Sequence, residues 1–67
     1  MQVEYDPQAD AVYISLQKKK VYKSREVSPG VVLDLGKDRV LIGIEILDAS
    51  KHFANKQLVN FSVKTFA

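Results

Sequence analysis

The sequence predicts a small α+β domain, with an antiparallel sheet of five or six strands and one short helix near the C-terminus. Apolar and polar side chains alternate along several short runs, which is the period of a half-buried strand. Proline, glycine and aspartate separate these runs at distances typical of hairpins. A chain of 67 residues is long enough for one sheet-rich domain, covering residues 1–67.

The first predicted hairpin lies near the N-terminus. A short strand at Gln2–Tyr5 is followed by Asp6-Pro7, where proline disfavours continuation of regular structure. The second strand, Ala11–Leu16, places alternate apolar side chains on one face. Asp6 and Asp10 offer oxygen atoms to a hard cation, but their spacing does not fit a calcium-binding loop. We therefore interpret both aspartates as turn residues.

The middle of the chain predicts three further strands. Val21–Val27 is the third and Val31–Leu35 the fourth, separated by the turn residues Ser28-Pro29-Gly30. A polar connection at Gly36–Arg39 has hairpin length. The fifth strand, Val40–Leu47, has the most regular alternation in the chain.

The C-terminal part predicts a helix and a last strand. Either Asp48 or Ser50 could cap a helix from Ala49 to Lys56, with Phe53 facing inward. Val59, Phe61 and Val63 then alternate with polar residues, which predicts a final strand.

Composition restricts the functional classes. The chain has no cysteine and one histidine, His52, so a Cys/His zinc site is excluded and no metal or cofactor is expected. No apolar run is long enough to span a membrane, and the N-terminus lacks a signal-peptide pattern, so we expect a cytoplasmic protein. A core this small favours association with another chain, and we expect a homodimer.

One group of residues suggests acid–base chemistry. Asp34 and Glu45 fall on neighbouring strands, each opposite the apolar stripe of its strand. Two close carboxyl groups can separate their pKa values, and His52 could join them, which is the pattern of a small hydrolase. The alternative is a solvated sheet face, which the small size of the chain favours because a catalytic pair needs a pocket.

A second group suggests binding. Residues 18–25, KKKVYKSR, hold five of the ten basic residues around Tyr22 and are expected to form a basic hairpin. Such a hairpin could contact nucleic acid, although the net charge of the chain is only +2. Its lysines could instead protect an edge strand from aggregation.

Several blocks resemble a known prokaryotic family, domain of unknown function 2283. They are YDPQADAVYI at residues 5–14, Glu26-Val27 with Pro29-Gly30-Val31, Leu33-Asp34, and GIEILDAS at residues 43–50. The resemblance implies no catalytic residues, and it implies a binding role like that of an antitoxin paired with a small ribonuclease-like toxin.

We therefore predict a non-enzymatic interaction domain. Partner contacts are expected at the basic hairpin and in the segment after residue 57, which lies outside the blocks of resemblance. The candidate contact residues are Lys19, Tyr22, Lys23, Arg25, Phe61 and Phe66.

Overall fold

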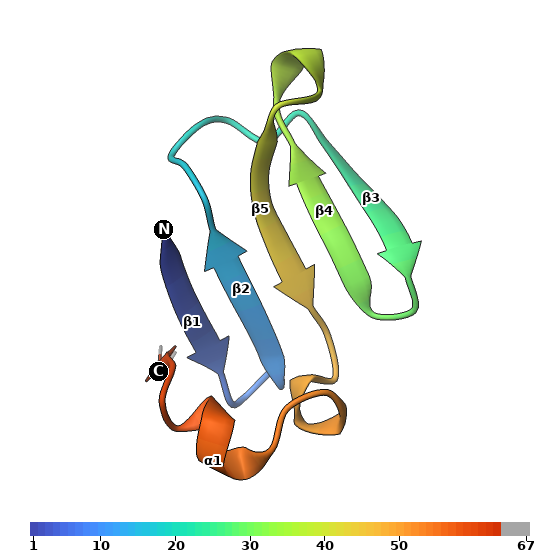
Figure 1. Ribbon diagram of the computed structural model, residues 1–67. Helices are drawn as coiled ribbons and strands as arrows, with labels where there is room; N and C mark the ends of the chain where they lie inside the picture. Colours follow the sequence, from blue (N-terminus) through green and yellow to red (C-terminus); the bar gives the residue numbers. More distant parts are fainter. Residues whose placement is uncertain (64–67) are drawn as a thin grey trace.

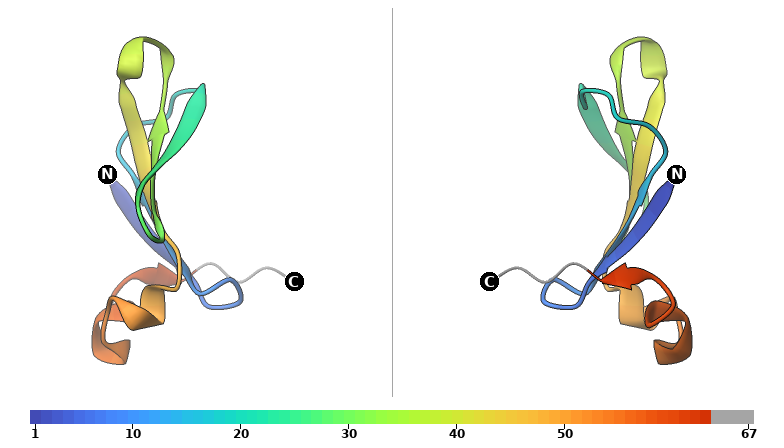
Figure 2. Two further views of the ribbon diagram at one scale, coloured as in Figure 1. Left: turned by 90° about the vertical axis from the view of Figure 1, so that its right-hand side faces the viewer. Right: turned by 90° about the vertical axis from the view of Figure 1, so that its left-hand side faces the viewer.

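The computed structural model describes residues 1–63 and shows a single curved sheet (Figures 1 and 2). A small C-terminal segment, residues 49–63, packs against one end of this sheet. Five strands form the antiparallel part of the sheet, and a short sixth strand follows the only α-helix of the described residues. In chain order the elements are β1 (Gln2–Asp6), β2 (Ala11–Ser15), β3 (Lys23–Ser28), β4 (Val31–Leu35), the 3-10 turn η1 (Lys37–Arg39), β5 (Leu41–Ile46), the 3-10 turn η2 (Ala49–Lys51), α1 (Asn55–Leu58) and β6 (Ser62–Val63).

The strands lie in the order β3-β4-β5-β2-β1-β6, so the N-terminal hairpin joins the sheet beside β5. The predicted hairpins β1–β2, β3–β4 and β4–β5 are confirmed, and all are antiparallel. The pair β1–β6 is parallel, with Tyr5 opposite Val63. The predicted antiparallel fold is therefore confirmed for β1–β5, with β6 as a parallel addition.

The basic run does not form the expected hairpin. The third strand begins at Lys23 instead of Val21, because residues 16–22 cross the end of the sheet from β2 to β3 (Figure 1). This crossover is needed because β5 and β4 lie between β2 and β3. The main-chain N–H of Tyr22 donates to Leu35 O at 2.7 Å, which holds the crossover against β4.

The predicted helix Ala49–Lys56 is wrong in its extent. Residues 49–51 form η2, Ala54 is extended, and α1 starts only at Asn55. In one continuous helix, Ala49 and Leu58 would lie about two and a half turns apart, on opposite faces. The break at Ala54 lets both side chains enter the core, where they are 0% and 4% exposed.

The predicted last strand is shorter than expected. Val59 ends α1 and is 73% exposed, and only Ser62–Val63 pairs with β1. Phe61 packs edge-on against Phe53, with ring centroids 5.4 Å apart. This aromatic pair, together with Leu58, covers Val12 and its neighbours, and this is where the core lies.

Candidate functional site

The corner between β1 and β2 gives different roles to the two N-terminal aspartates. Asp6 Oδ1 accepts hydrogen bonds from Gln8 N at 3.0 Å and Ala9 N at 3.4 Å, as expected for a turn residue. Asp10 does more than close the turn. It adopts a left-handed conformation with φ of 51° and reaches across to η2, so that it connects two distant parts of the chain.

Asp10 replaces the cap that the sequence suggested. Neither Asp48 nor Ser50 makes a side-chain capping bond at the start of η2. Asp10 Oδ1 accepts from Ser50 N at 3.0 Å, and Oδ2 accepts from Ser50 Oγ at 2.7 Å. Asp10 O also accepts from Ala49 N at 2.8 Å. Tyr5 Oη completes the group by donating to Asp10 Oδ1 at 2.9 Å.

These bonds change the acidity of both side chains. The hydrogen bonds from Ser50 and Tyr5 stabilise the charged carboxylate and lower the pKa of Asp10. The pKa of Tyr5 is raised, mainly because its hydroxyl proton is held by Asp10. The four residues Tyr5, Asp10, Ala49 and Ser50 all belong to the blocks of family resemblance, so this part of the motif is a structural link.

A second polar group lies on one face of the sheet, where the sequence places Asp34 and Glu45. Strand pairing puts Asp34 opposite Gly43 and Glu45 opposite Val32, so the two carboxyl groups are diagonal neighbours on that face. Asp34 is only 5% exposed and accepts a hydrogen bond from Ser24 Oγ at 2.7 Å. The Asp34 carboxylate also interacts with the Tyr13 hydroxyl.

Gly43 makes this arrangement possible. The Tyr13 ring lies directly over it, and a Cβ at this position would overlap Tyr13 Oη and Cζ and stand 2.9 Å from Ile14 O. The absence of a side chain at residue 43 therefore allows the tyrosine to lie flat across β5 and reach Asp34 on β4.

The two carboxyl groups influence each other. The pKa of Glu45 is raised, first by partial burial and then by its hydrogen bond to Asp34 and the repulsion of that carboxylate. Burial and the same carboxylate raise the pKa of Tyr13. A raised carboxyl pKa is what a general acid needs, and it is equally what a hydrogen-bonded structural pair produces.

His52 does not complete the predicted hydrolase group. It lies beside the β3–β4 turn, with Nε2 3.8 Å from the position of a Cβ on Gly30. No hydrogen bond within residues 1–63 joins it to Asp34 or Glu45, and these residues contain no group of three His, Cys, Asp or Glu side chains placed to hold a metal ion. Asp34 and Glu45 therefore interact with Ser24 and Tyr13 within the sheet, and His52 is not part of this group.

Basic side chains gather at the end of the sheet where the crossover passes the β4–β5 turn. A hollow of about 330 Å³ lies between them. The turn is strained, since Asp38 and Arg39 both have positive φ, 59° and 63°. The hollow is lined by Lys19, Lys20, Gly36, Lys37, Asp38, Val40 and Ile42.

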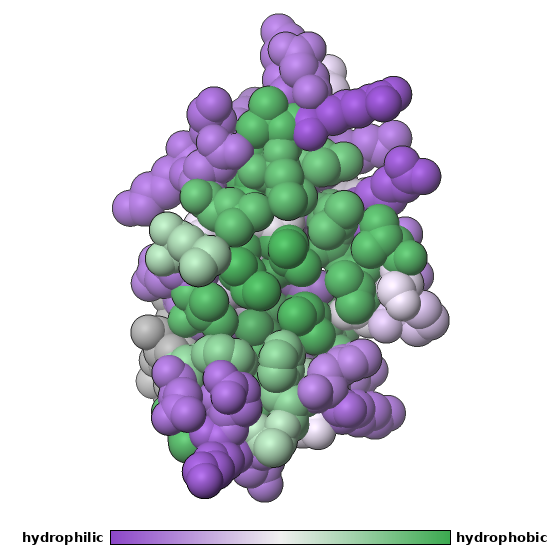
Figure 3. All heavy atoms as spheres, viewed as in Figure 1, coloured by the Kyte–Doolittle hydropathy of each residue, from purple (hydrophilic) through white to green (hydrophobic). Residues whose placement is uncertain are grey.

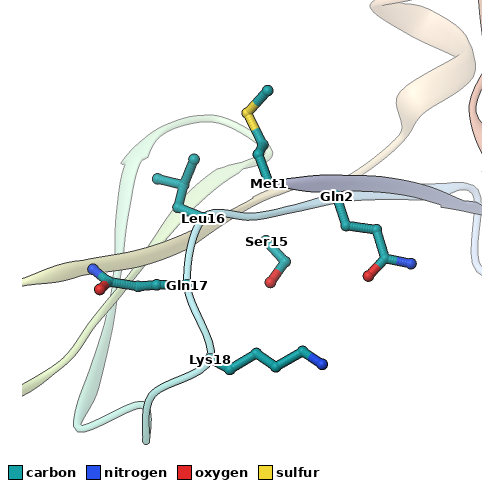
Figure 4. A pocket seen from close by; sticks show the side chains of 6 residues that line it. All are labelled: Met1, Gln2, Ser15, Leu16, Gln17 and Lys18. Carbon is teal, nitrogen blue, oxygen red and sulfur yellow. The ribbon is translucent and has the colours of Figure 1, made fainter.

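The two faces of the sheet differ in polarity and charge. Figure 4 shows this at a smaller hollow of about 180 Å³, where Met1 and Leu16 point to one side and Gln2, Ser15 and Lys18 to the other. The register places Lys23 and Arg25 on the same face as Leu33 and Leu35. The opposite face carries the five acidic residues of the strands, Glu4, Asp6, Glu26, Asp34 and Glu45.

The apolar face is only half covered by the chain itself. The C-terminal segment packs over the lower ends of β1 and β2 on that face, as the side views show (Figure 2). The remaining apolar side chains form a continuous surface over the middle and upper sheet (Figure 3). We call this surface the open apolar face and define it by the half-buried residues Leu16, Leu33, Leu35, Leu41 and Ile44.

The predicted contact residues fall in three places. Lys19 and Tyr22 are exposed in the crossover, and Lys23 and Arg25 are exposed on β3 beside the open apolar face. Phe61 packs within the chain's own core, and Phe66 lies outside the described residues. The open apolar face contains none of the predicted contact residues, although the alternation in β4 and β5 contains the signal for it.

The fold and these two faces define a small sheet domain with one apolar and one acidic face. Residues 2–50 match the model of the family described as "Protein of unknown function (DUF2283)", and the chain belongs to this family. The predicted family is thereby confirmed.

One curated relative is a Methanosarcina mazei protein named "Putative hypoxanthine phosphoribosyltransferase". It is 40% identical over 50 residues, which is 75% of this chain and 40% of that protein. The chain thus spans less than half the length of this relative. No solved structure matches the chain. Within residues 1–63, no helix has the length and apolar character needed to cross a membrane.

Proposed function

We propose that this chain is a non-enzymatic interaction domain that binds another polypeptide through the open apolar face. The observation that carries this proposal is the continuous surface of Leu and Ile side chains that the C-terminal segment leaves uncovered (Figure 3). Large contiguous apolar patches on small proteins usually mark interaction sites, since their exposure to water is unfavourable. Masking of a small toxin, as the family resemblance implies, is one specific use of such a surface.

A surface variant with a matched control tests the proposal. Ile44→Lys places a charge in the centre of the open apolar face, and Glu26→Gln changes an exposed residue on the opposite face. Tagged wild type and Glu26→Gln should retain the same polypeptides from the native cell, its own chain included, and Ile44→Lys should lose them. Equal retention by all three forms, with circular dichroism showing that each is folded, would contradict the proposal.

The cationic hollow favours a second candidate function, the binding of nucleic acid. Lys19, Lys20 and Lys37 come from two separate segments and line one hollow, with Asp38 as the single acidic group among its lining residues. Lysines grouped in this way can follow a phosphate backbone.

Fluorescence anisotropy with a single-stranded RNA separates this function from protein binding. Replacing the three lysines by glutamine should reduce the slope of log K against log salt by about 0.7 for each phosphate that is no longer neutralised. The control is Lys56→Gln, on α1 at the other end of the sheet. Absence of salt-dependent RNA binding by the wild type would exclude this second candidate.

A further inference from the structure

We infer that the occupant of the open apolar face is a second copy of this chain, packed face to face in an inverted orientation. This inference rests on the proposed function and adds the identity and arrangement of the partner. Three features of the molecule support a second copy of the chain as the partner.

The first feature is the amount of surface. The accessible area of the chain is 5074 Å². A folded monomer of 7.5 kDa is expected to expose only about 4,250 Å². The chain therefore exposes more surface than a compact monomer of its mass, and a standard interface would cover roughly 800 Å² on each partner. Only Val12, Ile42, Ala49 and Leu58 are buried hydrophobic residues in the described chain, so a second apolar layer would supply much of the missing core.

The second feature is the shape of the surface. The open apolar face is built from neighbouring strands, with Ile44 paired to Leu33 on one side and to Ile14 on the other. An extended layer of Leu and Ile side chains suits a second sheet at a spacing of about 10 Å, as in sheet sandwiches. Two identical apolar faces are self-complementary, which is what a closed two-fold dimer requires.

The third feature is the position of the C-terminal segment, which fixes the orientation. It projects from the apolar face at one end of the strands only (Figure 2). Two copies with their strands in the same direction would bring both segments to the same end, where they would collide. A two-fold axis perpendicular to the strands places the segments at opposite ends. Each then lies near the open end of the other copy, and the 73% exposed Val59 is a contact candidate there.

The charges beside the surface distinguish this partner from an acidic peptide. Lys23 and Arg25 flank the open apolar face, and all five strand carboxyl groups are on the other side of the sheet. In the dimer these cations lie near those of the other copy, so salt should strengthen association by screening the repulsion. An acidic peptide would instead bind more weakly as salt increases.

Cross-linking and sedimentation test the inference. The chain has no cysteine, so single-cysteine variants report on one position each. Ile44→Cys, treated with a bismaleimide spanning the roughly 10 Å between packed sheets, should give a covalent dimer at micromolar concentration. Glu26→Cys, on the opposite face, should remain monomeric. In sedimentation experiments the wild type should dimerise more tightly at high salt, and Ile44→Lys should weaken dimerisation at least a hundredfold.

The result that would overturn the inference is a wild type that stays monomeric over the micromolar to millimolar range. Equal cross-linking of Ile44→Cys and Glu26→Cys would also overturn it. A monomeric wild type whose other bound polypeptide is lost in Ile44→Lys would refute the dimer and leave the proposed interaction surface standing. A monomer that binds no polypeptide through this face would refute both. Circular dichroism of each variant separates loss of association from loss of folding.

Discussion

The two ends of the apolar face carry the same kind of side chain but meet different surroundings. At the covered end, Val12 is enclosed by Ala49 and Leu58 and is only 1% exposed. Asp10 secures this end by joining the first turn to η2. At the open end, Leu33 and Ile44 are paired in the sheet and half-buried, and neither belongs to the buried cluster. The chain stabilises one end by itself, and the other end is the surface on which the proposed partner would pack.

The largest effect should come from removing the side chain that covers the first end. Leu58→Ala should cost about 2–5 kcal/mol of unfolding free energy, because it removes packing in the buried cluster and leaves a cavity. Leu35→Ala, at the open end, is the matched control and should cost clearly less in dilute solution. Urea denaturation measures both. Equal losses would remove the distinction between the two ends.

A smaller loss of unfolding free energy is expected for a substitution on the polar face, behind the open end. Gly43→Ala should cost about 1–3 kcal/mol, because the new methyl group overlaps the Tyr13 ring. In a Tyr13→Ala background the same change should cost much less, so the double-mutant cycle should show strong coupling. Additive losses would show that the ring does not lie over Gly43.

The pH dependence of stability should have opposite signs at the two carboxyl sites. The pKa of Asp10 is lowered in the folded chain. The carboxylate therefore contributes its full share of the folding stability above pH 3.8, the ordinary pKa, and this share is lost as pH falls through the lower folded pKa. The pKa of Glu45 is raised in the folded chain. The protonated carboxyl group therefore contributes its full share of the folding stability below pH 4.5, the ordinary pKa, and this share is lost as pH rises through the higher folded pKa. Thermal midpoints from pH 2 to 8 measure both effects.

Two variants assign these effects. Asp10→Asn should flatten the acid side of the profile, and Glu45→Gln should flatten the side above pH 4.5 and raise the midpoint near neutral pH. An unchanged profile for Glu45→Gln would show that its carboxyl group does not interact with Asp34.

The smallest effect is expected at the strained turn between β4 and β5. Replacing Asp38-Arg39 by Asn-Gly should stabilise the chain by about 1 kcal/mol, since Asn and Gly tolerate the positive φ that both positions have. Arg39→Ala is the control, because it removes the charge and keeps a Cβ at positive φ. Denaturant midpoints compare the two, and an equal gain in the control would attribute the effect to charge.

Local chemistry predicted much of this molecule. The alternation of apolar residues located five strands. Because successive side chains of a strand point to opposite faces, it also placed Asp34 and Glu45 on the same face of the sheet. Asp6-Pro7 marked the first turn correctly. These features depend on near neighbours in the chain, which is why they could be predicted from the sequence.

The features that sequence reasoning missed depend on distant contacts. The cap of η2 comes from Asp10, forty positions before Ser50. The helix breaks at Ala54 because Ala49 and Leu58 must enter the same core, which no local propensity encodes. The crossover of residues 16–22 follows from the insertion of β5 beside β2. The open apolar face needed knowledge of where the C-terminal segment packs.

The insertion of β5 beside β2 also has a consequence for the order of folding events. Strands β3, β4 and β5 are joined by short turns and can pair locally, as can β1 and β2. The contact between Val12 and Ile46 instead closes a loop of more than thirty residues, which carries a higher entropic cost. We therefore expect the three-strand meander to form early and the N-terminal hairpin to dock later, making this docking the step that limits the folding rate.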